Sequence, residues 1–286
     1  MEEASDATDA AAAVAADPAI ASVRRCPYIA GRYGAIREVF EEVAVPIVRG
    51  LDADVARGVS SARAEVVGQR ATFAAACAAL RVQPALDRLR PWSRWITPVQ
   101  EKRRFDTRFW LLCFDGNRSE SDALAQRTAA ADEGEVFAMQ WLTPSRALDL
   151  YAAQTVTLAP PTWYTVRQLR DAFASFESLR DARSPHAVVA TTPAQPTPTT
   201  AAAQADASGD AERVFSAGWL PEIHMLPSAG ELAIVLPGDT RYGTAPERFE
   251  EAQAAGDTLH RIAVRGSDLA QMSTWRYTLL EGVRAR

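Results

Sequence analysis

The segment GAIREVFEEVAV, residues 34–45, places Glu38, Glu41 and Glu42 at positions i, i+3 and i+4. In a helix these three side chains share one face, with Cβ atoms about 5–6 Å apart. Carboxylates that close repel one another, and a hard divalent cation such as Mg²⁺ or Mn²⁺ would relieve the conflict through its preference for oxygen ligands. Such an ion could hold a diphosphate and activate a water as nucleophile. Arg37 could pair with Glu41 one turn on.

The same residues also fit the solvent-exposed side of an ordinary amphipathic helix, because surface helices often carry glutamate and arginine. From REVFEE alone the two interpretations are about equally good. An apolar side is present in either case. It is formed by Ala35, Ile36, Val39, Phe40 and Val43, whose spacing is that of a helix with one face in a core.

The elements around this helix are predicted from periodicity and from turn residues. An alanine-rich helical region is expected over 60–82 and a short helix near 84–90. Residues 104–114 alternate and then become continuously apolar, which indicates a central strand. A second strand is predicted over 135–144. Two helices then follow.

The first of these helices covers 145–154, with Ser145 or Thr143 as N-cap, and the second begins with prolines and covers 160–182. Three further strands are expected after residue 230, within segments 231–243, 258–266 and 273–282. They would complete or flank the same sheet.

Composition narrows the classes of partner. The formal net charge is −5 at pH 7, which argues against a general nucleic-acid or anionic-membrane binder. No apolar run reaches the length of a membrane span. The three cysteines, at positions 26, 77 and 113, have no metal-site spacing. The alanine-rich, acidic start has no secretory-signal pattern, so we expect a cytoplasmic protein.

REVFEE matches the second half of the Nudix box, and the chain resembles the coenzyme A diphosphatase-like branch of the Nudix hydrolases. The blocks that carry the resemblance are WSRWITP, RRFDTRFWLLCF, EVFAMQWLTPSRALDL and LAPPTWYTVRQL, in order between residues 92 and 169. The resemblance implies an α/β fold, a Nudix-like α/β/α sandwich with a mixed sheet. The domains would be a disordered tail over 1–22, a Nudix-like domain over 23–183 with a helical insertion at about 50–91, a flexible linker over 184–212, and a strand-rich extension over 213–286.

The resemblance also implies an activity. It is metal-dependent hydrolysis of a nucleoside diphosphate linked to another moiety, with a coenzyme A-like substrate favoured. Mg²⁺ or Mn²⁺ would be held by Glu38, Glu41 and Glu42, with Arg37 orienting these side chains. Glu41 and Glu42 match the strongest metal ligands of the family.

The sequence departs from the family pattern at two places, and these departures suggest an alternative function. Ala44 stands where the family has a glycine that ends the helix. The first half of the box, a glycine followed by a glutamate, is not found before Arg37, and no apolar strand fits there. We therefore expect a sheet without its N-terminal strands, in a truncated or divergent member. An exposed sheet edge could make a homodimer. The alternative function is a catalytically impaired Nudix fold that binds a nucleotide or a partner.

Other residues have a structural and a functional interpretation. Glu133 and Glu135 could assist the metal or the base, and a solvated turn is the more economical account. Asp106 and Arg108 could line the substrate cleft or only mark the polar face of a strand. For the tryptophans core packing is favoured over stacking on an adenine; they are Trp92, Trp95, Trp110 and Trp141.

Overall fold

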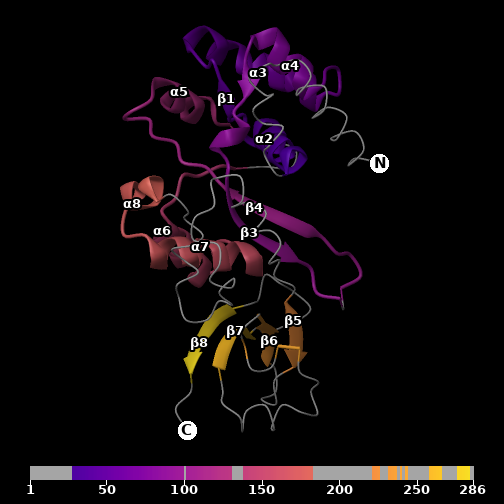
Figure 1. Ribbon diagram of the computed structural model, residues 1–286, viewed down its shortest axis with the longest axis vertical. Helices are drawn as coiled ribbons and strands as arrows, with labels where there is room; N and C mark the ends of the chain where they lie inside the picture. The colour runs from indigo at the N-terminus through magenta and orange to yellow at the C-terminus, as the bar shows by residue number, and fades with distance from the viewer. Residues whose placement is uncertain are drawn as a thin grey trace, which may run out of the picture. The chain divides into compact units, whose positions relative to one another are not determined.

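The computed structural model describes residues 28–99, 101–130, 138–182, 221–225, 231–236, 239, 242–243, 258–265 and 276–283. The predicted tail (1–22) and linker (184–212) lie outside them. The described residues form an α/β structure that divides into two compact units (Figure 1). The first unit contains 28–91 and 110–130, and the second contains 92–109, 142–182 and the strands beyond residue 220. The α/β class predicted from the sequence is confirmed.

The first unit is mainly helical. Its elements are α2 (Ile29–Val43), β1 (Val48–Arg49), α3 (Ala53–Val67), α4 (Phe73–Leu80), β2 (Gln83–Pro84), the 3₁₀ helix η2 (Leu86–Arg88) and α5 (Glu120–Thr128). Strands β1 and β2 are a short antiparallel pair. The range in which the helical insertion was predicted, about 50–91, contains α3 and α4.

The helical region predicted over 60–82 is confirmed, and it contains the end of one helix, α3, and the whole of a second, α4. Gly68 follows the last residue of α3, and Thr72 begins α4 by accepting a hydrogen bond from the backbone N–H of Ala75 at 3.1 Å. Helix α3 also begins earlier than predicted, because the Asp52 carboxylate accepts from the backbone N–H groups of Asp54 and Val55. Alanine favours helix throughout the segment, and these caps decide where each helix ends.

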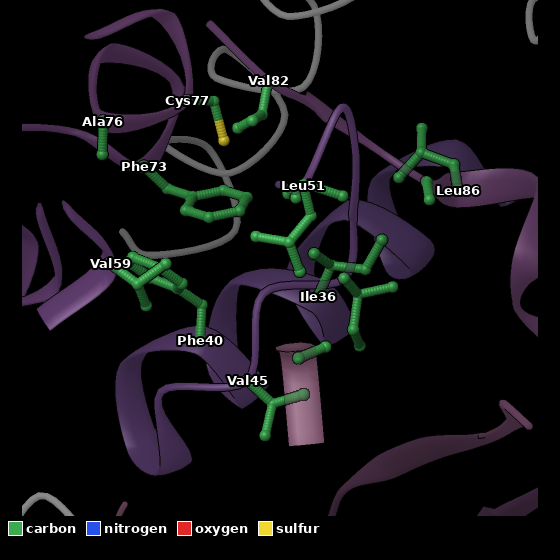
Figure 2. Close-up of a cluster of buried hydrophobic side chains, with 14 of the residues drawn as sticks. Ile36, Phe40, Val45, Leu51, Val59, Phe73, Ala76, Cys77, Val82 and Leu86 are labelled. Carbon is green, nitrogen blue, oxygen red and sulfur yellow. The ribbon is translucent and has the colours of Figure 1, made fainter. Parts of the chain in front are cut away.

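The core of the first unit lies between α2, α3 and α4 (Figure 2). The Phe73 ring packs against the Tyr33 ring at 5.5 Å and against the Phe40 ring at 5.2 Å between centroids. Ile36 and Val59 are fully buried beside them. Aromatic pairs of this kind add about 0.5–1.5 kcal/mol each to the free energy of burial, so α2 is held firmly by its apolar face.

Strands β3 (Arg90–Ile96) and β4 (Asp106–Leu111) form a two-stranded sheet, and the boundaries of the units fall within them. The strand predicted over 104–114 is confirmed as β4. Among the described residues β4 pairs with β3 alone, so the expected central position is not observed there. The hairpin is closed beyond the strands by Thr97, whose N–H donates to the Phe105 carbonyl at 2.9 Å. Strand β3 was not predicted.

The strand predicted over 135–144 is not found in its described part. Residues 138–143 have no regular structure, and the remainder lies outside the described residues. Trp141 is 62% exposed and Leu142 is 42% exposed. An extended segment needs a neighbouring strand for its backbone hydrogen bonds, and alternating apolar residues alone do not provide one.

Three helices follow in the second unit. They are α6 (Pro144–Ala152), α7 (Pro160–Ala172) and α8 (Phe176–Asp181). Thr143 is the N-cap of α6, as predicted, and accepts from the backbone N–H of Arg146 at 3.2 Å. The single helix predicted over 160–182 is wrong, because Phe173 is extended and a capping box between Ser175 and Ser178 begins a new helix.

The second unit also contains a four-stranded antiparallel sheet. Its strands are β5 (Glu222–Met225), β6 (Glu231–Val235), β7 (Thr258–Arg265) and β8 (Arg276–Val283), in that spatial order. Strands β6, β7 and β8 were predicted and β5 was not. Together they form a sheet separate from β3 and β4.

The core of the second unit joins this sheet to helices. Ile262 and Val264 from β7 belong to one buried cluster with Tyr151, Trp163 and Tyr164 from α6 and α7. No helix in the described ranges is both long enough and apolar enough to cross a membrane. The single mixed sheet of an α/β/α sandwich, and the predicted absence of N-terminal strands, stay predictions.

Candidate metal site

Helix α2 separates an apolar face from an acidic one. Tyr33, Ile36 and Phe40 are at most 2% exposed and face the core. Their spacing of three and four residues leaves Glu38, Glu41 and Glu42 off the buried face. Glu38 is exposed, while Glu41 and Glu42 are partly buried. The core packing of α2 therefore fixes which side chains are available for chemistry.

Arg37 binds two of the predicted ligands. Its Nη2 lies 2.5 Å from Oε1 of Glu38, and its Nη1 lies 3.7 Å from Oε1 of Glu41. The pairing with Glu41 confirms the prediction from the i, i+4 spacing. The side chain of Glu38 is 50% exposed and that of Glu41 is 23% exposed. The guanidinium thus holds two carboxylates around one positive charge.

Helix α2 ends at Ala44 in a left-handed conformation, with φ 55° and ψ 24°. This is the position where the resemblance expects glycine, and an L-residue adopts this conformation at a cost of about 1 kcal/mol. The Ala44 N–H still donates to the Phe40 carbonyl at 3.1 Å. Alanine therefore makes the same terminating turn as glycine at a higher conformational energy.

Arg63, from α3, contacts the same end of α2. Its Nε donates to the Glu41 carbonyl at 2.7 Å, and its Nη2 donates to the Glu42 carbonyl at 3.1 Å. The sequence did not point to this residue. Its only signal was an arginine in an alanine-rich helix, and its partners lie 21 and 22 residues away.

The chemistry of the donors fits a hard divalent cation. Glu38, Glu41 and Glu42 supply carboxylate oxygens, which Mg²⁺ and Mn²⁺ prefer. Within the part of the chain that the structure describes, no three aspartate, glutamate, histidine or cysteine side chains are grouped closely enough to hold a metal. Mg²⁺ is commonly held by one or two carboxylates together with substrate phosphates and water, and the pair around Arg37 meets that smaller requirement.

Asp106, on strand β4, forms ion pairs with two arginines. Arg94 donates to its two carboxylate oxygens at 2.6 and 2.7 Å, and Arg108 contacts it at 3.3 Å. The hydrogen bonds from Arg94, and then the charge of Arg108, hold the pKa of this carboxyl below its ordinary value. These contacts fit the polar-face interpretation, while a role in a substrate cleft stays a prediction.

The tryptophans have different environments. Trp92 and Trp95 are buried, which confirms core packing for both. Core packing is wrong for Trp141, whose side chain lies mostly exposed in the irregular segment before α6. Trp110 is half-buried, with the Arg32 guanidinium 4.7 Å from its ring centroid. Glu133 and Glu135 lie outside the described residues.

Comparison with known proteins places this site in a family. The family model described as the NUDT19 Nudix domain matches residues 8–169. That range includes α2 with its acidic face, helices α3 and α4 and the β3–β4 hairpin, and it exceeds half of the chain. The chain therefore belongs to the NUDT19 Nudix domain family, as the resemblance indicated.

Three curated relatives carry the name acyl-coenzyme A diphosphatase NUDT19. The Xenopus laevis protein is 32% identical over 159 residues, which cover 49% of this chain and 39% of that relative. The human protein is 33% identical over 167 residues, covering 54% and 41%. The Gallus gallus protein is 25% identical over 272 residues, covering 84% and 62%. The chain thus matches less than two thirds of the length of each, and no solved structure gives a significant match.

Proposed function

We propose that this chain is a metal-dependent Nudix hydrolase that cleaves the diphosphate of a coenzyme A-type substrate. The observation that carries the proposal is the double ion pair of Arg37 with Glu38 and Glu41 on α2. Membership of the NUDT19 Nudix domain family, and the names of the relatives, support the reaction class and the type of substrate.

Glu38, Glu41 and Glu42 would hold Mg²⁺ or Mn²⁺ on the exposed side of α2. When bound, the ion would neutralise charge on the diphosphate and lower the pKa of a water that attacks phosphorus. Arg37 keeps the carboxylates of Glu38 and Glu41 turned toward one place before the ion arrives. The side chain of Glu41 is less exposed than that of Glu38, at 23% against 50%, and we expect Glu41 to contribute more than Glu38 to binding.

A second candidate function is a Nudix fold that binds a nucleotide or a partner with little turnover. Ala44 favours it, because this strained residue lies two positions after Glu42, at the end of the turn that carries the two strongest proposed ligands. The scattered arrangement of the three carboxylates also fits this alternative. The α/β/α sandwich, a homodimer through a sheet edge and a cytoplasmic location are further proposals from the same resemblance.

The experiment that separates the two functions is product detection with purified protein. Coenzyme A, acyl-coenzyme A, NADH and nucleotide sugars are each incubated with Mg²⁺ or Mn²⁺, and the phosphorylated products are separated by chromatography. We expect coenzyme A-type substrates to give two phosphorylated products only when the metal is present.

Glu41→Gln is the test variant, and Glu65→Gln on α3 is the control. Glu65 is a half-exposed glutamate paired with Arg70, away from the acidic face of α2. Loss of a metal ligand should lower kcat by about 100-fold or more, while the control keeps the activity of the unmodified protein. No metal-dependent product from any substrate, with metal still bound, would favour the second function.

A further inference from the structure

We infer that Arg63 is a positioning residue for the proposed metal site, because it fixes the turn of α2 that carries Glu41 and Glu42. The inference rests on the proposed function. It adds a residue from outside the acidic motif and gives the insertion helix α3 a role in the chemistry.

The end of α2 shows why Arg63 matters. The last four carbonyls of a helix have no partner within the helix itself. In α2 each of them accepts a hydrogen bond. Ala44 N–H donates to the Phe40 carbonyl at 3.1 Å, and Ala130 N–H donates to the Val43 carbonyl at 2.9 Å. The two remaining carbonyls, of Glu41 and Glu42, are the ones bound by Arg63.

The chemistry of the guanidinium suits this double contact. It presents several N–H donors in a rigid planar fork, so one side chain can reach two neighbouring carbonyls at once. A lysine ammonium is a compact charge on a flexible stem and lacks that fixed geometry. A positive charge beside the C-terminal end of a helix is also favourable, because the exposed carbonyls are partially negative.

Helix α3 is held by a buried residue and by an N-cap, so the backbone that carries Arg63 is fixed relative to α2. Val59, one turn before Arg63, is fully buried in the cluster that contains Phe40 and Phe73. The start of α3 is capped by Asp52, which accepts two backbone hydrogen bonds at 2.9 Å. Residues i and i+4 share a helix face, so burial of Val59 directs Arg63 toward α2.

Arg37 and Arg63 therefore act on different parts of the same ligands. Arg37 contacts the carboxylates of Glu38 and Glu41, whereas Arg63 contacts the backbone carbonyls of Glu41 and Glu42. Arg63 thus supports the backbone of the turn that carries the two proposed ligands. Residues that orient metal ligands from outside the ligand set commonly change metal affinity about 10–100-fold when replaced.

The test measures Mn²⁺ affinity by electron paramagnetic resonance titration of the full chain, with Mn²⁺ alone as the probe. The variants are Arg63→Gln and Arg63→Lys, and the control is Arg57→Gln. Arg57 lies on the same helix α3, is exposed and pairs with Asp54 within that helix. We expect Arg63→Gln to weaken Mn²⁺ binding at least about 10-fold, Arg63→Lys to fall between it and the unmodified protein, and Arg57→Gln to bind normally.

Hydrogen exchange of peptides covering 38–46 separates positioning from a general loss of stability. At a temperature well below the melting midpoint of every variant, Arg63→Gln should accelerate exchange at this turn while peptides of α4 stay protected. If Arg63→Gln does not fold, Arg63→Lys takes its place with the same comparison. A weaker Mn²⁺ affinity with local loss of protection supports the inference.

The experiment distinguishes a failure of the inference about Arg63 from a failure of the proposed function. If the unmodified protein binds Mn²⁺ and hydrolyses substrate, and a folded Arg63 variant binds Mn²⁺ equally well, the inference about Arg63 is overturned and the proposed function stands. If the unmodified protein neither binds Mn²⁺ nor gives product, the proposed function fails first, and the inference fails with it.

Discussion

The two compact units bury their cores with different residues and over different distances in the sequence. The first core is largely aliphatic, with Phe40 and Phe73 at its centre, and most of it comes from residues 33–89. The second core is rich in aromatic residues, among them Trp95, Trp163 and Tyr164, and is completed by strands near residues 234 and 262. The acidic helix α2 belongs to the first, more local unit.

This difference bears on how the site is supported. Contacts between residues close in sequence form at a lower entropic cost than contacts between distant ones. The first unit can therefore assemble around α2 without waiting for the C-terminal strands. The second unit requires the chain to return from beyond residue 230 before Tyr164 and Trp163 are covered.

The largest expected effects come from breaking each core in turn. Phe40→Ala and Trp163→Ala each remove a buried aromatic ring, and each should lower the free energy of unfolding by about 3–5 kcal/mol. Hydrogen exchange should show Phe40→Ala exposing α3 and α4, and Trp163→Ala exposing α6 and β7. Equal loss of protection in both units from either variant would mean that they unfold as one.

A smaller effect on the free energy of unfolding is expected from replacing either of two aspartates, one buried and one exposed. Asp122 has a side chain 8% exposed, binds Arg88 at 2.7 Å and accepts from the Asp115 N–H at 2.8 Å in the first unit. Asp122→Ala should cost about 2–3 kcal/mol, because Arg88 and the part-buried N–H of Asp115 would lose their acceptor.

Asp106, in the second unit, is 38% exposed and binds Arg94 at 2.6 Å. Asp106→Ala should cost less than about 1 kcal/mol, because the exposed pair is screened by water. Urea denaturation of both variants measures the difference, and equal losses would contradict the role given to burial.

The buried thiol of Cys77 gives the first unit a pH dependence that a methyl group cannot have. Burial raises the pKa of Cys77 from 9.0 to about 12. The folded protein therefore keeps a proton that the unfolded chain releases above pH 9, so stability is complete below that pH and falls as pH rises toward 12. The loss should be about 1.4 kcal/mol per pH unit. Unfolding measured from pH 8 to 10.5 should show no contribution from this thiol below pH 9 and a slope that develops toward this value above it, and Cys77→Ala should remove that contribution.

The smallest effect compares two left-handed residues. Ala44 follows α2 in the first unit with φ 55°, and Gln154 follows α6 in the second with φ 61°. Glycine at either position should raise the free energy of unfolding by about 0.5–1 kcal/mol, because glycine adopts this conformation without a Cβ clash. Thermal melts of Ala44→Gly and Gln154→Gly check this. A decrease at Ala44 alone would show that its buried methyl group contributes more than the strain removes.

Elements with local signals could be predicted from the sequence. The acidic and apolar faces of α2, the Thr143 cap of α6 and the strands β6 to β8 all follow from spacing or from a capping residue. The pairing of Arg37 with Glu41 also follows, because residues i and i+4 meet on any helix.

Features that depend on distant partners could not be predicted. Residues 138–143 resemble a strand, yet pairing depends on a neighbour that the local sequence does not reveal. The division of 60–82 into two helices depends on Gly68, which follows α3, and on Thr72, which caps α4. Arg63 reaches the Glu41 carbonyl across 22 residues, and only the packing of α3 on α2 brings them together.

The arginine between two glutamates has a consequence for the order in which the protein is assembled. Arg37 offsets part of the charge of Glu38 and Glu41, and α2 is anchored by Tyr33 and Phe40 on its other side, so we expect this helix to fold without a bound ion. We expect a chelator to leave the fold intact and ion loading to be reversible. The guanidinium is then a resident counter-ion that keeps both carboxylates in position for an arriving cation.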